Sequence, residues 1–109
     1  MSGGRGDLLR GTLEMLILRC LEEGPMHGWA ITERLQRVSD DVLTVDEGSL
    51  YPALYRMQRR GWLTSEWGRS ANNRRARFYS VTAKGAKQLA SATENWNRFS
   101  EAVSRAMSP

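Results

Sequence analysis

The chain has 109 residues, 40% of them apolar and 26% charged, and its formal net charge is +4 at pH 7. This length fits one small domain with a modest core, and the ordinary charged fraction argues against a disordered protein. No apolar run approaches the ~20 residues that a membrane span needs, and the N-terminal MSGGRGD lacks the apolar segment of a signal peptide. The lone Cys20 cannot form an internal disulfide. We therefore expect a cytoplasmic protein with no membrane partner and a flexible N-terminus over residues 1–7.

The first predicted helix carries an apolar stripe and ends before Gly24. The stripe consists of apolar residues at helical spacing, namely Leu9, Leu13, Leu16, Ile17, Cys20 and Leu21. Gly24 can adopt the left-handed conformation that ends a helix, and Pro25 cannot continue the hydrogen-bond ladder. On this stripe Cys20 is interpreted as a small buried apolar residue, with redox sensing as the weaker alternative.

A second, shorter helix is predicted from about Gly28 to Val38, ended by Ser39-Asp40-Asp41. Its apolar side should be buried and its charged side exposed, with Ile31, Leu35 and Val38 inside and Glu33, Arg34 and Arg37 outside. His27, the only histidine, lies in the turn before this helix. Capping or fixing that turn is favoured there over catalysis or metal binding.

The third predicted helix has two candidate starts. Thr44-x-x-Glu47 fits a capping box, and Asp46 is a good N-cap two residues later. Pro52 favours the later start, because a proline costs less near the first turn than deep in a helix, although a bend at Pro52 is an alternative. Gly61 ends the helix, whose buried stripe should be Leu50, Leu54 and Met57.

A β-hairpin should follow. Residues 62–67 alternate with the period of a half-buried strand, residues 68–75 are turn-formers and arginines, and residues 77–81 are rich in aromatic and β-branched side chains. We expect Tyr79 and Val81 to face the core with Leu63.

A final helix, capped by Thr82, should run to about Met107. Its apolar residues follow the spacing of coiled-coil core positions, namely Leu89, Ala92, Trp96, Phe99, Val103 and Ala106. Trp96 and Phe99 have two compatible interpretations: they are the core of a dimer, or they line a ligand cavity between two subunits.

Positive charge is concentrated in one segment. Residues 48–87 contain nine basic residues and one acid, whereas the rest of the chain contains seven basic and eleven acidic residues. An amphipathic helix followed by a basic-tipped hairpin is typical of a winged helix that binds duplex DNA. We therefore predict a mainly α fold with a small β-hairpin, that is, a winged helix-turn-helix.

Four short motifs occur in a characteristic order. They are Gly-x-Leu at 11–13, Gly-Pro-x-His-Gly at 24–28, Gly-Ser-Leu-Tyr-Pro-Ala-Leu at 48–54 and Tyr-x-Val-Thr-x-x-Gly at 79–85. Through them residues 8–89, roughly three quarters of the chain, resemble the PadR family of bacterial transcriptional regulators. Two departures are conservative: Trp29 stands where the family commonly has Tyr, and Ser49 where Thr is more usual.

The resemblance implies a dimeric winged helix-turn-helix repressor whose C-terminal helix supports dimerisation. It also implies that small, often aromatic ligands release some members of the family from DNA. Here a planar aromatic effector would contact Trp96 and Phe99. We divide the chain into a DNA-binding domain over residues 8–82 and a C-terminal dimerisation helix over residues 83–107. The expected dimer interface comprises Leu8, Leu9, Leu89, Ala92, Trp96, Phe99 and Val103.

The polar face of the third helix and the hairpin supply the expected DNA contacts. Arginine can donate two hydrogen bonds to guanine, hydroxyls can bond phosphates, and a basic hairpin tip can lie along phosphates or enter the minor groove. The candidate residues are Ser49, Tyr51, Pro52, Tyr55, Arg56, Arg59, Arg69, Asn73, Arg74, Arg75 and Arg77. For Tyr51 the alternative is packing against the second helix, and for the arginines the alternative is a solvated surface.

These observations predict a homodimeric repressor of a pseudo-palindromic operator, with no cofactor, no metal site and no enzymatic activity. The competing hypothesis is a ligand-sensing or protein-docking module in which the winged helix does not bind DNA directly. No nucleophile–base pair, metal-ligand cluster or phosphate-binding glycine loop occurs in the sequence.

Overall fold

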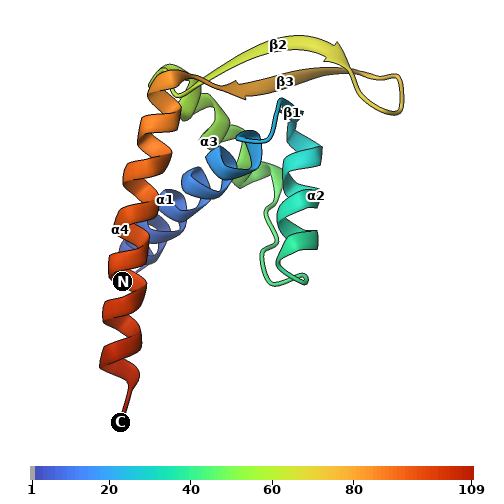
Figure 1. The fold of residues 1–109 in the computed structure, drawn as a ribbon. Helices are drawn as coiled ribbons and strands as arrows, with labels where there is room; N and C mark the ends of the chain where they lie inside the picture. Colours follow the sequence, from blue (N-terminus) through green and yellow to red (C-terminus); the bar gives the residue numbers. More distant parts are fainter. Residues whose placement is uncertain (1) are drawn as a thin grey trace.

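The computed structural model describes the backbone of residues 2–109 and the side chains of residues 11–109. Its elements are α1 (Ser2–Leu21), β1 (Met26–His27), α2 (Gly28–Val38), α3 (Glu47–Arg59), β2 (Leu63–Arg69), β3 (Arg75–Val81) and α4 (Ala83–Met107). The helices pack beneath an antiparallel sheet of order β1-β3-β2, and the β2–β3 hairpin projects from one end of α4 (Figure 1). This is the winged helix-turn-helix that the sequence predicts.

The first helix is longer than predicted. α1 begins at Ser2, so residues 2–7 are helical, whereas the sequence indicated a flexible N-terminus. Adding residues to a helix costs little once a nucleus has formed, and the buried second half of α1 provides that nucleus. The side chains of Leu8 and Leu9, both predicted at a dimer interface, lie outside the described residues.

Side-chain caps fix the starts of α2 and α3. The backbone N–H of Ala30 donates to His27 Nδ1 at 3.3 Å, which confirms the capping role predicted for the histidine. The N–H of Ser49 donates to the Asp46 carboxylate at 2.8 Å, so α3 takes the later of its two candidate starts. Each cap satisfies an N–H that the first turn of a helix leaves without a partner.

The connection between α2 and α3 overturns one burial prediction. Val38 is 61% exposed, although its spacing placed it with Ile31 and Leu35. α2 ends at Val38, and Asp40 and Asp41 then turn the chain with φ values of 55° and 69°. This turn carries the chain away from the core before another element covers Val38.

The sheet is larger than the predicted hairpin. β2 and β3 extend to Arg69 and Arg75, which leaves only residues 70–74 as the tip. The short strand β1 also pairs with β3 through Met26 and Tyr79. Two residues are too few to show an alternating pattern, so the sequence carried no periodic signal for β1.

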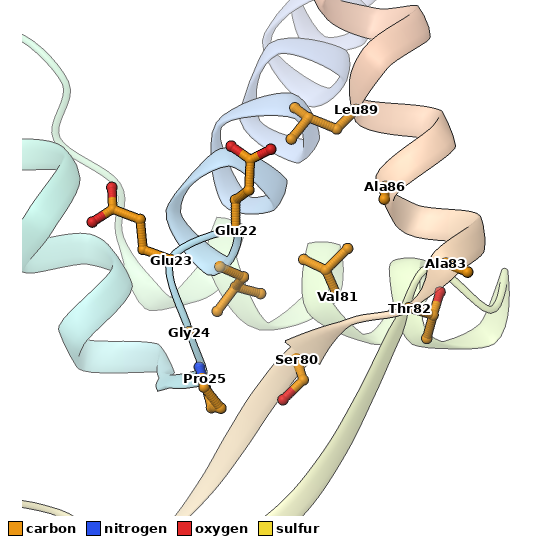
Figure 2. A pocket seen from close by; sticks show the side chains of 11 residues that line it. Glu22, Glu23, Gly24, Pro25, Ser80, Val81, Thr82, Ala83, Ala86 and Leu89 are labelled. Carbon is orange, nitrogen blue, oxygen red and sulfur yellow. The ribbon is translucent and has the colours of Figure 1, made fainter.

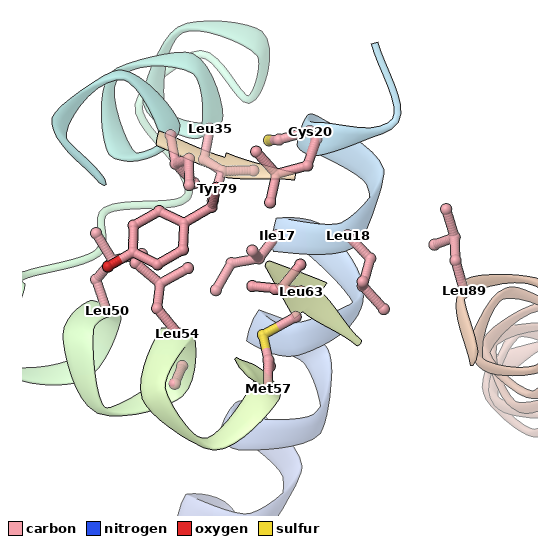
Figure 3. Packing of buried hydrophobic residues seen from close by; sticks show 13 residues of the cluster. Ile17, Leu18, Cys20, Leu35, Leu50, Leu54, Met57, Leu63, Tyr79 and Leu89 are labelled. Atoms are coloured by element: carbon pink, nitrogen blue, oxygen red, sulfur yellow. The ribbon is translucent and has the colours of Figure 1, made fainter. Parts of the chain in front are cut away.

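The core lies where α1, α2, α3 and the base of the hairpin meet (Figure 3). Its fully buried large side chains are Ile17, Leu18, Ile31, Leu50, Leu54, Met57 and Leu63. Tyr79 is buried and Val81 packs against the same cluster, as predicted. Cys20 is also buried, and this burial raises the pKa of its thiol, as expected for an unreactive apolar position.

The last helix begins at the predicted cap and then leaves the body of the protein (Figure 1). Thr82 Oγ1 accepts from the N–H of Gly85 at 3.0 Å and donates to the carbonyl of Gly61 at 2.6 Å. Leu89 packs against the side of α1 that carries Leu18. Beyond it Trp96, Phe99, Val103 and Met107 are exposed in the single chain. Within the described part of the chain, no helix combines the length and apolarity needed to cross a bilayer.

Candidate nucleic-acid interface

The exposed face of α3 carries three of the predicted DNA-binding residues, Pro52, Tyr55 and Arg59. Leu50, Ala53, Leu54 and Met57 fill the opposite face and fix the helix against the core. The Arg59 guanidinium lies 5.7 Å from the centre of the Tyr55 ring, so an aromatic neighbour orients its charge. Ser49, in the first turn, is also exposed.

Arg56 lies beside Pro52 at the edge of this face that turns toward α1, where it is paired with an acid. Its Nε donates to Glu14 Oε2 on α1 at 3.2 Å, and its side chain is only 28% exposed. Arg60 approaches the other oxygen of the same carboxylate at 3.5 Å. In the free protein, Arg56, which we expect to read bases, therefore forms an ion pair that joins α3 to α1. Contact with DNA by Arg56 stays a prediction.

Tyr51 packs against the start of α2, which is the alternative that the sequence offers for this residue. A methyl group built on Gly28 would lie 2.6 Å from the Tyr51 hydroxyl oxygen and 2.9 Å from Cζ. With the ring in this position, only glycine fits at residue 28. The Tyr51 side chain nevertheless remains 45% exposed, so packing and DNA contact are compatible.

Backbone hydrogen bonds shape the tip of the hairpin, which we call the wing. The N–H of Ser70 donates to the Arg74 carbonyl, and the N–H of Asn73 donates to the Ser70 carbonyl, both at 2.9 Å. Asn73 has φ 60°, a left-handed conformation that Asn tolerates better than most residues. Arg69 Nη1 donates to the Asn73 carbonyl at 3.2 Å, so Arg69 braces the tip, whereas Arg74 is exposed beside it.

Trp67, which was not among the residues predicted from the sequence, organises the other two arginines of the wing. The guanidinium of Arg75 lies 4.2 Å from the centre of the indole, and that of Arg77 lies 5.2 Å from it. Trp67 is 55% exposed because it lies on the face of Leu63 but beyond the edge of the core. The alternation of residues 62–67 identified this face, yet could not show where the core ends.

The wing and the helix-turn-helix flank one hollow of about 630 Å³. Tyr51 and Trp29 line it from the helices, and Trp67, Arg74 and Arg77 line it from the wing. Trp29, which is 63% exposed, is a second aromatic residue that was not among the predicted site residues. The hollow therefore combines aromatic surface with positive charge.

Two other hollows lie elsewhere. One, of about 460 Å³, separates the end of α1 from the start of α4 and is lined in part by Glu22 and Glu23 (Figure 2). It contains none of the predicted DNA-binding residues. The other, of about 530 Å³, lies between α1, the α2–α3 connection and the start of α3, and includes Ser49, Pro52 and Arg56.

The predicted dimer residues of α4 divide into two groups. Leu89 is buried and Ala92 is half-buried within the single chain. Trp96, Phe99 and Val103 are 41%, 52% and 43% exposed, and the rings of Trp96 and Phe99 are 6.1 Å apart. The second group is an apolar surface that the fold of one chain leaves open.

Known proteins of one family share this architecture. Residues 17–91 match the model of the transcriptional regulator PadR-like family. A transcriptional regulator from Clostridium thermocellum has 25% sequence identity and a TM-score of 0.84, with 94% of this chain and 99% of that chain covered. A PadR-like regulator from Bacillus cereus has 27% identity and a TM-score of 0.80, with 94% and 98% covered. A PadR family regulator from Eggerthella lenta has 29% identity and a TM-score of 0.76, with 97% and 90% covered. The chain therefore belongs to the PadR-like family, and the protein is a DNA-binding transcriptional regulator rather than an enzyme.

Proposed function

We propose that the protein represses transcription by binding a pseudo-palindromic operator as a homodimer. The observation that carries this proposal is the shared hollow, which Tyr51 of α3 and the wing arginines Arg74 and Arg77 line together. A duplex that touches one of these elements would meet the other. With α3 in the major groove, the hollow would face the sugar-phosphate backbone and the wing would follow it.

The proposed contacts divide into two groups. Tyr55 and Arg59, on the exposed face of α3, read base edges, while Ser49, Tyr51 and Pro52 approach the backbone beside them. Arg74 and Asn73 at the tip, with Arg75 and Arg77 behind them, contact phosphates or the minor groove. Arg69 acts through the tip that it braces. The Nε of Arg56 is held by Glu14, so a DNA contact by Arg56 would use its Nη groups or break this pair.

The exposed apolar surface of α4 supports dimerisation. A single chain buries Leu89 but leaves Trp96, Phe99 and Val103 in contact with solvent, which is costly for large apolar side chains. A second copy would cover them. The same rings would line any cavity between the subunits, and a planar aromatic effector would bind there. Such a regulator would act in the cytoplasm.

Trp96→Glu tests the dimer. The charge should shift the protein toward monomer in sedimentation equilibrium and weaken operator binding, whereas Glu101→Gln, at another exposed position of α4, should do neither. A Trp96→Glu protein that sediments as the wild type does would contradict this interface.

DNA binding is tested by titrating duplex DNA from upstream of the protein's own coding region at several salt concentrations. Affinity should fall with salt, with a log–log slope of about −0.9 for each phosphate neutralised. Arg74→Ala should weaken binding to all duplexes and flatten that slope, whereas Arg59→Ala should reduce discrimination between operator and unrelated DNA. Equal, sequence-blind losses for both variants would refute this division. The titration is repeated with planar aromatic compounds, which should release the DNA if Trp96 and Phe99 bind an effector.

The alternative is a module that senses a ligand or docks a protein without touching DNA. It would predict no binding to any duplex, even at low salt.

A further inference from the structure

We propose that Trp67 is a positioning residue, which holds Arg75 and Arg77 as a preorganised clamp for backbone phosphates of DNA. This inference rests on the proposed function and assigns a role to an uncharged residue within it. Its starting point is the strand register. Trp67 pairs directly with Arg77. Arg75 comes two residues before Arg77 in β3 and therefore lies on the same face of the strand. Both guanidinium groups consequently reach one indole, at 4.2 Å and 5.2 Å from its centre.

The core does not account for this tryptophan. Trp67 is 55% exposed and is absent from the cluster of buried and half-buried residues that stabilises the fold. An exposed indole on a projecting hairpin contributes little apolar burial. The charged groups over its ring are the two arginines, and a tryptophan face is the aromatic surface that attracts cations best.

Neither arginine is neutralised by an acid. Among the described residues, no carboxylate lies within 4 Å of Arg75 or Arg77, and the one acid of β2, Glu66, pairs with Phe78 on the opposite face. The indole therefore holds both guanidinium groups against one ring without an acidic partner, so N–H donors of both arginines remain available to an anion. A phosphate would supply the negative charge that both arginines lack.

A chain of hydrogen bonds ties this clamp to the recognition helix. Arg77 Nε donates to Ser65 Oγ at 2.7 Å, and Ser65 Oγ donates to Gln58 Oε1 on α3 at 3.2 Å. The position of Arg77 is thereby fixed relative to α3. Both arginines and Trp67 also line the hollow that Tyr51 of α3 shares. The clamp therefore fits a phosphate of the same duplex that α3 reads.

The slope of affinity against salt separates this role from simple packing, because the slope counts phosphates neutralised by charge. Trp67 has no charge, so if its ring merely touched DNA, its removal would lower affinity and leave the slope unchanged. If Trp67 holds the arginines, Trp67→Leu should flatten the slope as Arg75→Ala and Arg77→Ala do. The expected change is about 0.9 for each phosphate that is no longer neutralised, and twice that for a dimer. We expect binding at moderate salt to weaken roughly tenfold. Trp67→Phe should restore most of the slope.

Two further variants complete the experiment. In the Arg75→Ala/Arg77→Ala background, Trp67→Leu should cause no additional change, because residues that act as a unit are not additive. Trp29→Leu, at the other exposed tryptophan of the hollow, should leave the slope at the wild-type value. If circular dichroism shows that Trp67→Leu is unfolded, Trp67→Thr replaces it, since threonine suits an exposed strand position.

The inference would be overturned if the folded Trp67 variant kept the wild-type salt slope. It would also be overturned if Trp67→Leu changed the slope as much in the Arg75→Ala/Arg77→Ala background as in the wild type. Neither outcome would contradict DNA binding itself. A wild-type protein that binds no duplex at low salt would refute the proposed function and this inference together.

Discussion

Glu14 on α1 and Arg56 on α3 form a hydrogen-bonded ion pair over 3.2 Å, across 42 positions of sequence. The Glu14 side chain is 11% exposed, and Arg60 shares its carboxylate. A carboxylate with so little access to water depends on its partners for stability. The pair therefore ties α3, the helix that we propose reads DNA, to the first helix.

Removing this carboxylate should destabilise the protein. Glu14→Ala leaves a half-buried arginine without its partner, and we expect the free energy of unfolding to fall by about 1–3 kcal/mol. Urea denaturation measures the loss. Glu22→Ala is the matched control, because it breaks the exposed pair of Glu22 with Arg19 and should cost no more than about 1 kcal/mol. Equal costs for the two variants would show that the burial of Glu14 contributes nothing.

Gly85 occupies a position that excludes any larger side chain. A methyl group built there would lie 2.2 Å from the carbonyl oxygen of Trp62, and that oxygen belongs to the backbone and cannot rotate away. Gly85→Ala should therefore lower the free energy of unfolding by about 2–4 kcal/mol, by forcing α4 away from the base of the hairpin. Among the described side chains, the methyl group of Gly11→Ala meets no atom within 4 Å, so this substitution should be neutral or stabilising by up to ~1 kcal/mol. Thermal unfolding of the two variants tests the contrast.

Local sequence signals predicted most of the fold because local interactions set the element boundaries. Asp46, His27 and Thr82 cap helices through hydrogen bonds to residues three positions ahead, a distance at which sequence spacing is informative. Charge and helical periodicity also identified α3 and the wing. Val38 shows the limit, since its burial depends on whether a distant element covers it.

The candidate site was harder to predict for the same reason. Glu14 is 42 positions from Arg56 in the sequence. The pattern of α3 alone placed Arg56 among the arginines available to DNA and gave no sign of this acidic partner. The role proposed for Trp67 depends on two arginines of the neighbouring strand and on its place beyond the edge of the core. Such roles arise from contacts between elements. The periodicity of one segment carries no information about these contacts.

Gly28 offers a test that separates function from stability. Gly28→Ala would place a methyl group 2.6 Å from the Tyr51 hydroxyl, and the ring can swing away because it is the end of a side chain. We expect a change in unfolding free energy below about 1 kcal/mol, since alanine also favours the helix. Affinity for duplex DNA should nevertheless fall, because Tyr51 leaves the hollow. In a Tyr51→Ala background the same substitution should have no further effect on binding, and an undiminished effect would exclude this mechanism.

Tyr79 should make stability fall at alkaline pH. Burial raises the pKa of its hydroxyl, and the nearby Arg77 only partly opposes this effect. The unfolded chain, with an ordinary tyrosine pKa of about 10, releases the proton before the folded chain does, so unfolding is favoured as pH rises above that value. The stabilisation is fully present below about pH 10 and is lost as pH rises through the folded-state pKa. Tyr79→Phe should remove this part of the alkaline loss in urea titrations from about pH 8 to about pH 11, whereas the exposed Tyr55→Phe should follow the wild type. If Tyr79→Phe loses stability with pH as steeply as the wild type, the burial of this hydroxyl is not the cause.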